Sequence, residues 1–179
     1  MFRENSSYLL GVVAALATVT IWAAFLIGTR FAVSGNLTVD EVLILRLVPA
    51  FLIMLPLMFK LGIIIKGQPI FSLLMIALGA TAIFPYLIST GVYYAPASDA
   101  GALAPGMLPF WTALFAFIIT GEKPSKIRFF GLIIILAGAF LVGSYSILSS
   151  SDQSTWKGHL LFLAGSGMWS IYSVYFRQS

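Results

Sequence analysis

Long apolar runs separated by short polar segments make up most of this 179-residue chain. A helix needs about 20 apolar residues to cross the roughly 30 Å hydrocarbon core of a bilayer, and the uncharged runs repeatedly reach that length. The predicted spans cover residues 5–29, 42–59, 69–94, 100–121, 129–149 and 158–176. The pattern predicts an all-α fold, a polytopic transmembrane helix bundle with six helices in this chain.

The composition supports a protein whose main partner is the lipid bilayer. Apolar residues make up 60% of the chain, charged residues only 9%, and the mean hydropathy is +1.01. Soluble domains are about 25% charged. Without cysteine and with one histidine, His159, no thiolate or histidine metal cluster is available, and no catalytic dyad is visible. We therefore expect no enzyme activity, no metal or other cofactor and, since the basic residues form no stripe, no nucleic acid partner.

The basic residues predict the orientation in the membrane, because cytoplasmic loops carry an excess of Lys and Arg. With the N-terminus inside, seven of the ten basic residues face the cytoplasm and three lie toward the outside. The cytoplasmic set is Arg3, Lys60, Lys66, Lys123, Lys126, Arg128 and Arg177. We therefore expect a multi-pass protein of a plasma membrane, the bacterial inner membrane, with a cytoplasmic N-terminus.

The last span repeats the first. At an offset of 147 residues, the first span has Gly11, Leu16, Ala17, Trp22 and Arg30, and the last has Gly158, Leu163, Ala164, Trp169 and Arg177. Five helices separate equivalent points, so the second copy would enter the membrane inverted, as in many secondary transporters. The expected units are a first repeat at 8–145, a Ser-rich external linker at 146–157 and the start of a second repeat at 158–179.

Two prolines interrupt the fourth span. Pro105 and Pro109 lack the N–H that bonds four residues back, so they should free the carbonyls of Gly101 and Pro105. Freed carbonyls at membrane depth are tolerated where they are covered by neighbouring helices or line a wet cavity. A packing kink and a cavity wall are both compatible with this pattern.

Polar aromatic side chains mark a candidate substrate site near the middle of the membrane. Tyr86, Thr90 and Tyr93 share one helical face of the third span, and Trp22 and Trp169 are equivalent in the two repeats. The tryptophans could serve helix packing or flank a pocket that stacks on a flat or cationic ligand. The predicted substrate-binding residues are Trp22, Tyr86, Thr90, Tyr93, Gly101, Pro105, Pro109 and Trp169.

Three charged residues are structural or gating candidates. Arg46 is the one clearly enclosed charge, and it could snorkel, pair with Asp40 or Glu41, or attract an anion. Asp99 is expected to cap the N-terminus of the fourth helix. Glu122 is expected to pair with nearby basic residues as a structural latch of its loop.

The segment from residue 93 to 142 resembles the EamA repeat of the drug/metabolite transporter superfamily. The resemblance rests on Tyr-Tyr-Ala-Pro-Ala-Ser-Asp-Ala-Gly-Ala-Leu, Pro-Phe-Trp-Thr-Ala-Leu, Gly-Glu-Lys-Pro-Ser and Gly-Leu-Ile-Ile-Ile-Leu-Ala-Gly, in that order. Trp22 and Arg46 also match recurring positions of that family. The resemblance covers nearly all of 8–145, and 158–177 looks like the first helix of a second EamA repeat.

The resemblance implies a ten-helix, inverted-repeat secondary transporter that exports or imports small metabolites such as amino acids or drugs by alternating access. Against that plan the six-helix chain looks like a truncated form. The alternatives are a non-transporting membrane subunit or assembly factor, and a half-size unit that works as a homodimer.

Overall fold

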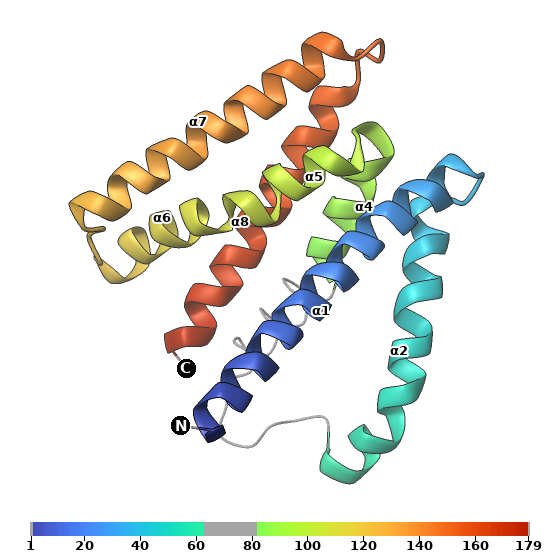
Figure 1. Ribbon diagram of the computed structural model, residues 1–179. Coiled ribbons are helices and arrows are strands. Elements are labelled where there is room, and N and C mark those ends of the chain that lie inside the picture. Colours follow the sequence, from blue (N-terminus) through green and yellow to red (C-terminus); the bar gives the residue numbers. More distant parts are fainter. Residues whose placement is uncertain (1, 63–81, 179) are drawn as a thin grey trace.

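The computed structural model describes residues 2–62 and 82–178, and the regular structure of this part is helical throughout (Figure 1). The elements are α1 (Phe2–Ser34), α2 (Val39–Leu61), α4 (Phe84–Tyr94), α5 (Ala97–Leu103), the 3₁₀ turn η2 (Pro105–Met107), α6 (Leu108–Thr120), α7 (Lys126–Ser149) and α8 (Thr155–Gln178). The predicted all-α transmembrane bundle is confirmed.

Four segments of the described chain are long and apolar enough to cross a membrane. They are Tyr8–Ser34, Val39–Lys60, Ala97–Thr120 and Lys126–Ser149, and they coincide with the predicted first, second, fourth and fifth spans. Half of the predicted third span, 69–81, lies outside the described residues, and the described half contains α4. The predicted sixth span corresponds to α8, whose 24 residues have the required length but which is not among the four segments apolar enough to cross a membrane.

Local sequence signals set the helix ends at the two hairpin turns. Thr38 and Glu41 form a capping box at the start of α2, in which the Thr38 N–H donates to the Glu41 carboxylate at 2.8 Å. Gly121 ends α6 in a left-handed conformation with φ of 72°, and Ser125 caps α7 through the Arg128 N–H. These caps satisfy backbone groups where the helices leave the apolar layer.

The core lies around α8, which packs against α4 and α6 (Figure 1). Gly158 brings α8 so close to α4 that a Cβ there would lie 2.5 Å from the Cβ of Ala95 and 2.7 Å from the Gly91 carbonyl oxygen. Phe162 fills the space one turn later and is fully buried. Small residues thus permit close packing between helices in a membrane, where dispersion contacts replace the hydrophobic effect.

α8 is less apolar than the four candidate spans because polar residues lie on its buried face. Its buried face carries His159, Ser166 and Ser170, whose polar atoms contact other helices. In contrast, no residue of α7 is buried, and α7 presents large apolar side chains such as Phe140 and Leu148 outward. A helix surrounded by protein can hold polar groups that a helix facing lipid cannot.

The helix is interrupted between α5 and α6, as the prolines predict. One of the two carbonyls expected to be free is nevertheless hydrogen-bonded. α5 ends at Leu103, Ala104 forms a turn, and η2 follows. The Leu108 N–H donates to the carbonyl of Pro105, so that carbonyl is not freed as expected. In a 3₁₀ turn the donor is the N–H three residues later instead of four, so Leu108 can replace the N–H that Pro109 lacks.

Candidate functional site

A cavity of about 230 Å³ lies where α1, α2, α4 and α8 meet. The indole rings of Trp22 and Trp169 are in an edge-to-face arrangement, 6.0 Å between centroids, and Phe84 contacts both of them. The described residues that line the cavity are Ile21, Trp22, Phe25, Arg46, Phe84, Pro85 and Trp169. Trp22 and Trp169, which align as equivalent positions in the sequence, therefore come together from α1 and α8.

Arg46 provides the only charge among the described lining residues of this aromatic cavity. Its guanidinium lies 3.8 Å from the centroid of the Phe25 ring, a cation–π contact between α2 and α1. It forms no ion pair with Asp40 or Glu41 within the described residues, and the Glu41 carboxylate is engaged by Thr38. An arginine held by one ring face keeps its N–H donors free for a carboxylate or phosphate.

The third-span candidates lie outside the aromatic cavity. Tyr86 is 49% exposed, and Tyr93 lines a separate pocket with Arg30 and Asp152. The Thr90 hydroxyl is buried and has no hydrogen-bond partner among the described residues. Arg30 donates to the carbonyls of Val92 and Tyr93 at 2.6 and 2.9 Å, which caps the C-terminus of α4.

The candidates of the fourth span lie at the helix break, which faces α8 instead of the cavity. Ser166 donates to the Ala104 carbonyl at 2.7 Å, and Ser170 donates to the Leu108 carbonyl at 3.4 Å. Gly101 and Pro109 are exposed. Two serines one turn apart on α8 therefore bind the carbonyls at the break, and the break serves the packing of α8 against α5 and α6.

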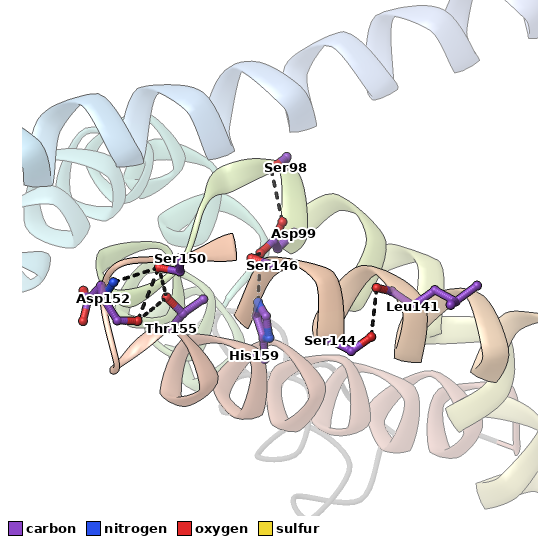
Figure 2. A network of polar contacts seen from close by, with 9 residues as sticks. All are labelled: Ser98, Asp99, Leu141, Ser144, Ser146, Ser150, Asp152, Thr155 and His159. Atoms are coloured by element: carbon purple, nitrogen blue, oxygen red, sulfur yellow. Dashed lines mark hydrogen bonds and ion pairs between the residues drawn. The ribbon is translucent and has the colours of Figure 1, made fainter. Parts of the chain in front are cut away.

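A buried polar network joins α5, α7 and α8 (Figure 2). The Asp99 carboxylate accepts from the Ser98 hydroxyl at 3.2 Å and from the Ser146 hydroxyl, and it is hydrogen-bonded to Nε2 of His159 at 2.8 Å. Both Asp99 and His159 are more than nine-tenths buried. The Nδ1 atom of His159 is also buried and has no hydrogen-bond partner among the described residues.

The structure corrects two sequence predictions in this region. Asp99 does not cap its helix, because Pro96 occupies the N-cap position and the Asp99 side chain turns to α7 and α8. The Ser-rich segment 146–157 is only partly a loop, since α7 continues to Ser149 and α8 begins at Thr155. Ser146 lies within α7, and its hydroxyl donates to the Asp99 carboxylate.

Glu122 lies at the opposite end of α8 in an open arrangement. It borders a pocket of about 250 Å³ with Thr120 and Arg177, and an adjoining pocket with Lys123 and Arg128. In the described part of the chain the ion pair within 4 Å is that of His159 and Asp99, so the predicted latch of Glu122 does not form. When two exposed long side chains pair in water, the loss of side-chain entropy offsets most of the electrostatic gain. The side chains around Glu122 therefore gain little from pairing.

Sequence reasoning missed several residues that build these sites, namely Phe25, Phe84, Ser146, His159, Ser166 and Ser170. The serines had a readable signal, because Ser166 and Ser170 lie four residues apart on one helical face. His159 and Asp99 were both visible as polar residues near membrane boundaries. Their contact spans 60 positions in the sequence, and only the packing of α5 on α8 reveals it.

The helices, their lipid-facing surfaces and the buried polar contacts together define a multi-pass membrane protein. A comparison with protein families matches the EamA-like transporter family over residues 9–144. The chain belongs to this family of transporters, which confirms the resemblance noted in the sequence. No curated protein and no solved structure matches the chain at a significant level.

Proposed function

We propose that this protein is a secondary transporter of small organic anions, with the aromatic cavity as its substrate site. The observation that carries the proposal is the position of Arg46, whose guanidinium enters a cavity walled by Trp22, Phe84 and Trp169. An anionic group would meet the guanidinium donors, and a flat apolar part would meet the indole rings. A cationic ligand would face repulsion from Arg46.

The size of the cavity favours a small metabolite. Its volume of about 230 Å³ is below the roughly 300–1,000 Å³ of sites for drug-sized ligands. Because α1 and α8 carry the equivalent tryptophans, the cavity lies where an inverted repeat would place a shared site. Alternating access would then move the unit 8–145 against the unit that begins at 158.

The orientation is part of the proposal. A cytoplasmic N-terminus in a bacterial inner membrane follows from the excess of Lys and Arg in the loops around 60–66 and 121–128. A cysteine introduced as Ser125→Cys should stay protected from an impermeant reagent added to intact cells. The chain has no cysteine of its own, so labelling from outside would reverse the orientation.

Ligand binding to the purified chain tests the substrate class. In the variant Trp111→Phe/Trp156→Phe, the remaining tryptophans are Trp22 and Trp169, so their fluorescence reports on the cavity. Aromatic carboxylates should quench this fluorescence saturably, and flat cations of the same size should not. A bound ligand is then used in counterflow assays with proteoliposomes, which test transport separately from binding.

Arg46 variants decide whether the charge selects the ligand. Arg46→Gln should weaken carboxylate binding about tenfold or more, because a charged hydrogen bond is worth about 1.5–3 kcal/mol. Arg46→Lys should retain part of the affinity, and Arg128→Gln, outside the cavity, should change nothing. Equal binding of anions and cations, or unchanged affinity in Arg46→Gln, would remove Arg46 from the site.

A further inference from the structure

A long groove separates α6 from α7, away from the aromatic cavity. Its volume is about 630 Å³, and its walls are apolar except at one end. The side chains along it include Phe110, Leu114 and Phe117 of α6, and Phe130, Ile133 and Leu136 of α7. A groove of this size and composition can take a flexible apolar chain.

The charges of the groove are confined to its end at the α6–α7 turn. Lys123 and Lys126 border it there, and no other described lining residue is charged. From Lys126 to Leu136 the groove follows α7 over ten helical rises, about 15 Å at 1.5 Å each. That length is half of the roughly 30 Å hydrocarbon core, so the groove covers the depth of one leaflet.

We propose that this groove binds an anionic phospholipid. One acyl chain lies between α6 and α7, and the headgroup phosphate lies between Lys123 and Lys126 at the membrane surface. Basic residues beside clefts between membrane helices are known to hold acidic lipid headgroups. The proposal rests on membrane insertion alone and does not depend on the substrate or on the direction of transport.

The shape and charge of the groove favour a lipid over other occupants. A soluble anion would use the two lysines but leave the apolar walls without a partner. A helix would span both leaflets, whereas the groove and its charges fit a molecule with one polar end and one leaflet of apolar length. α7 has no buried residue and is apolar and long enough to cross a membrane, so the groove beside it is open to a lipid.

One acidic group lies close to the proposed headgroup position. Glu122 borders the neighbouring pocket with Lys123, Pro124 and Arg128. Its carboxylate would repel a phosphate, but the turn from residue 121 to 128 carries three basic residues against this one acid. The excess positive charge therefore still favours an anionic headgroup over a zwitterionic one.

The test is lipid retention by the purified full chain. The protein is incubated in detergent with equal amounts of phosphatidylglycerol and phosphatidylcholine, and bound lipid is counted by native mass spectrometry. We expect one phosphatidylglycerol to be retained in preference to phosphatidylcholine. Lys126→Gln should lower this preference about fivefold. The matched control Lys60→Gln removes a basic charge at the end of α2, outside the groove, and should change it less than twofold.

A second variant tests the apolar part of the groove. Leu114→Trp should fill it and release the lipid, whereas Leu148→Trp, at an exposed position of α7 outside the groove, should leave lipid retention unchanged. Glycerol phosphate should not displace the bound lipid, because it lacks the acyl chain. Equal retention of both lipids, equal effects of Lys126→Gln and Lys60→Gln, or displacement by glycerol phosphate would overturn the proposal. A disulfide-linked dimer of Ile133→Cys in lipid nanodiscs would assign the groove to a second copy instead.

Discussion

At one end of the unit formed by α5, α6, α7 and α8, a buried carboxylate binds three partners, whereas at the other end the charged side chains border open pockets. We call these the Asp99 end and the Glu122 end. Asp99 contacts Ser98, Ser146 and His159, and Arg30 caps α4 nearby. Glu122 and Arg177 share a pocket of about 250 Å³ without an ion pair. Both ends carry charged side chains, but Asp99 is buried and hydrogen-bonded at its end, whereas Glu122 and Arg177 border an open pocket at theirs.

The difference shows that buried polar contacts hold the helices together at the Asp99 end, whereas the described charged side chains at the Glu122 end form no ion pair. At the Asp99 end, burial makes each polar contact necessary, because an unpaired buried charge is costly. At the Glu122 end, solvent screens the charges, and pairing brings little. Between the ends, the break near Ala104 interrupts α5 and α6, and Ser166 holds it to α8.

The largest expected effect comes from breaking the Asp99 end. Asp99→Ala removes the shared hydrogen-bond partner of Ser98, Ser146 and His159, and each buried group left unsatisfied costs about 1–3 kcal/mol, so the total should be about 3–5 kcal/mol. The apparent free energy of unfolding in detergent, followed by helical circular dichroism, should fall by that amount. Asp40→Ala, at an exposed position in the first turn of α2, is the matched control and should cost less than about 1 kcal/mol.

The double variant Asp99→Leu/His159→Leu sharpens this prediction. It removes both polar partners, and apolar replacements of a buried pair are often neutral or stabilising. We expect it to be more stable than Asp99→Ala. If Asp99→Ala and Asp40→Ala unfold alike, the network does not fasten the helices, and the contrast between the two ends disappears.

A smaller effect should follow from separating α4 and α8 beside the network. Gly158→Ala places a methyl group within 3 Å of the backbone of Gly91 and Ala95, so the helices must move apart. Overpacking of this kind costs about 1–3 kcal/mol. Gly138→Ala on α7 meets nothing within 4 Å and should be neutral or slightly stabilising, because alanine favours helix. Equal unfolding temperatures of the two variants would show that the close approach is unnecessary.

Much of the fold was predictable from the sequence because the bilayer imposes helix length directly. The four long spans and the broken helix at Pro105 follow from apolar runs and proline. Trp22 and Trp169, both predicted to bind substrate, lie next to each other, whereas the repeat that relates them in the sequence stays a prediction. Half of the predicted third span lies outside the described residues, so the sequence prediction for 69–81 stays a prediction.

The site was less predictable, because it depends on which side chains meet across helices. Asp99 has the residue type and position of a helix cap, yet its carboxylate reaches His159, 60 residues away. Tyr86 and Tyr93 share a helical face with Thr90, yet that face does not open into the aromatic cavity. Periodicity gives the face of a helix, whereas the neighbour of that face comes from packing between distant segments.

The smallest expected effect concerns the loop at the Asp99 end and its dependence on pH. Asp152 accepts from the Ser154 hydroxyl at 2.7 Å and from the Ser154 N–H at 2.8 Å, and these bonds hold the pKa of Asp152 below its ordinary value of 3.8, with smaller contributions from Lys157 and Arg30. A lowered folded-state pKa stabilises the fold above the ordinary pKa, and this contribution is lost as the pH falls through the lowered value. The unfolding temperature of the wild type should therefore exceed that of Asp152→Asn by a constant amount at pH 5–7, and the gap should close as the pH falls below about 3.9. Because the carboxylate is fully exposed, the gap should be small, and a gap that stays constant down to acidic pH would show that the ionised carboxylate does not stabilise this end.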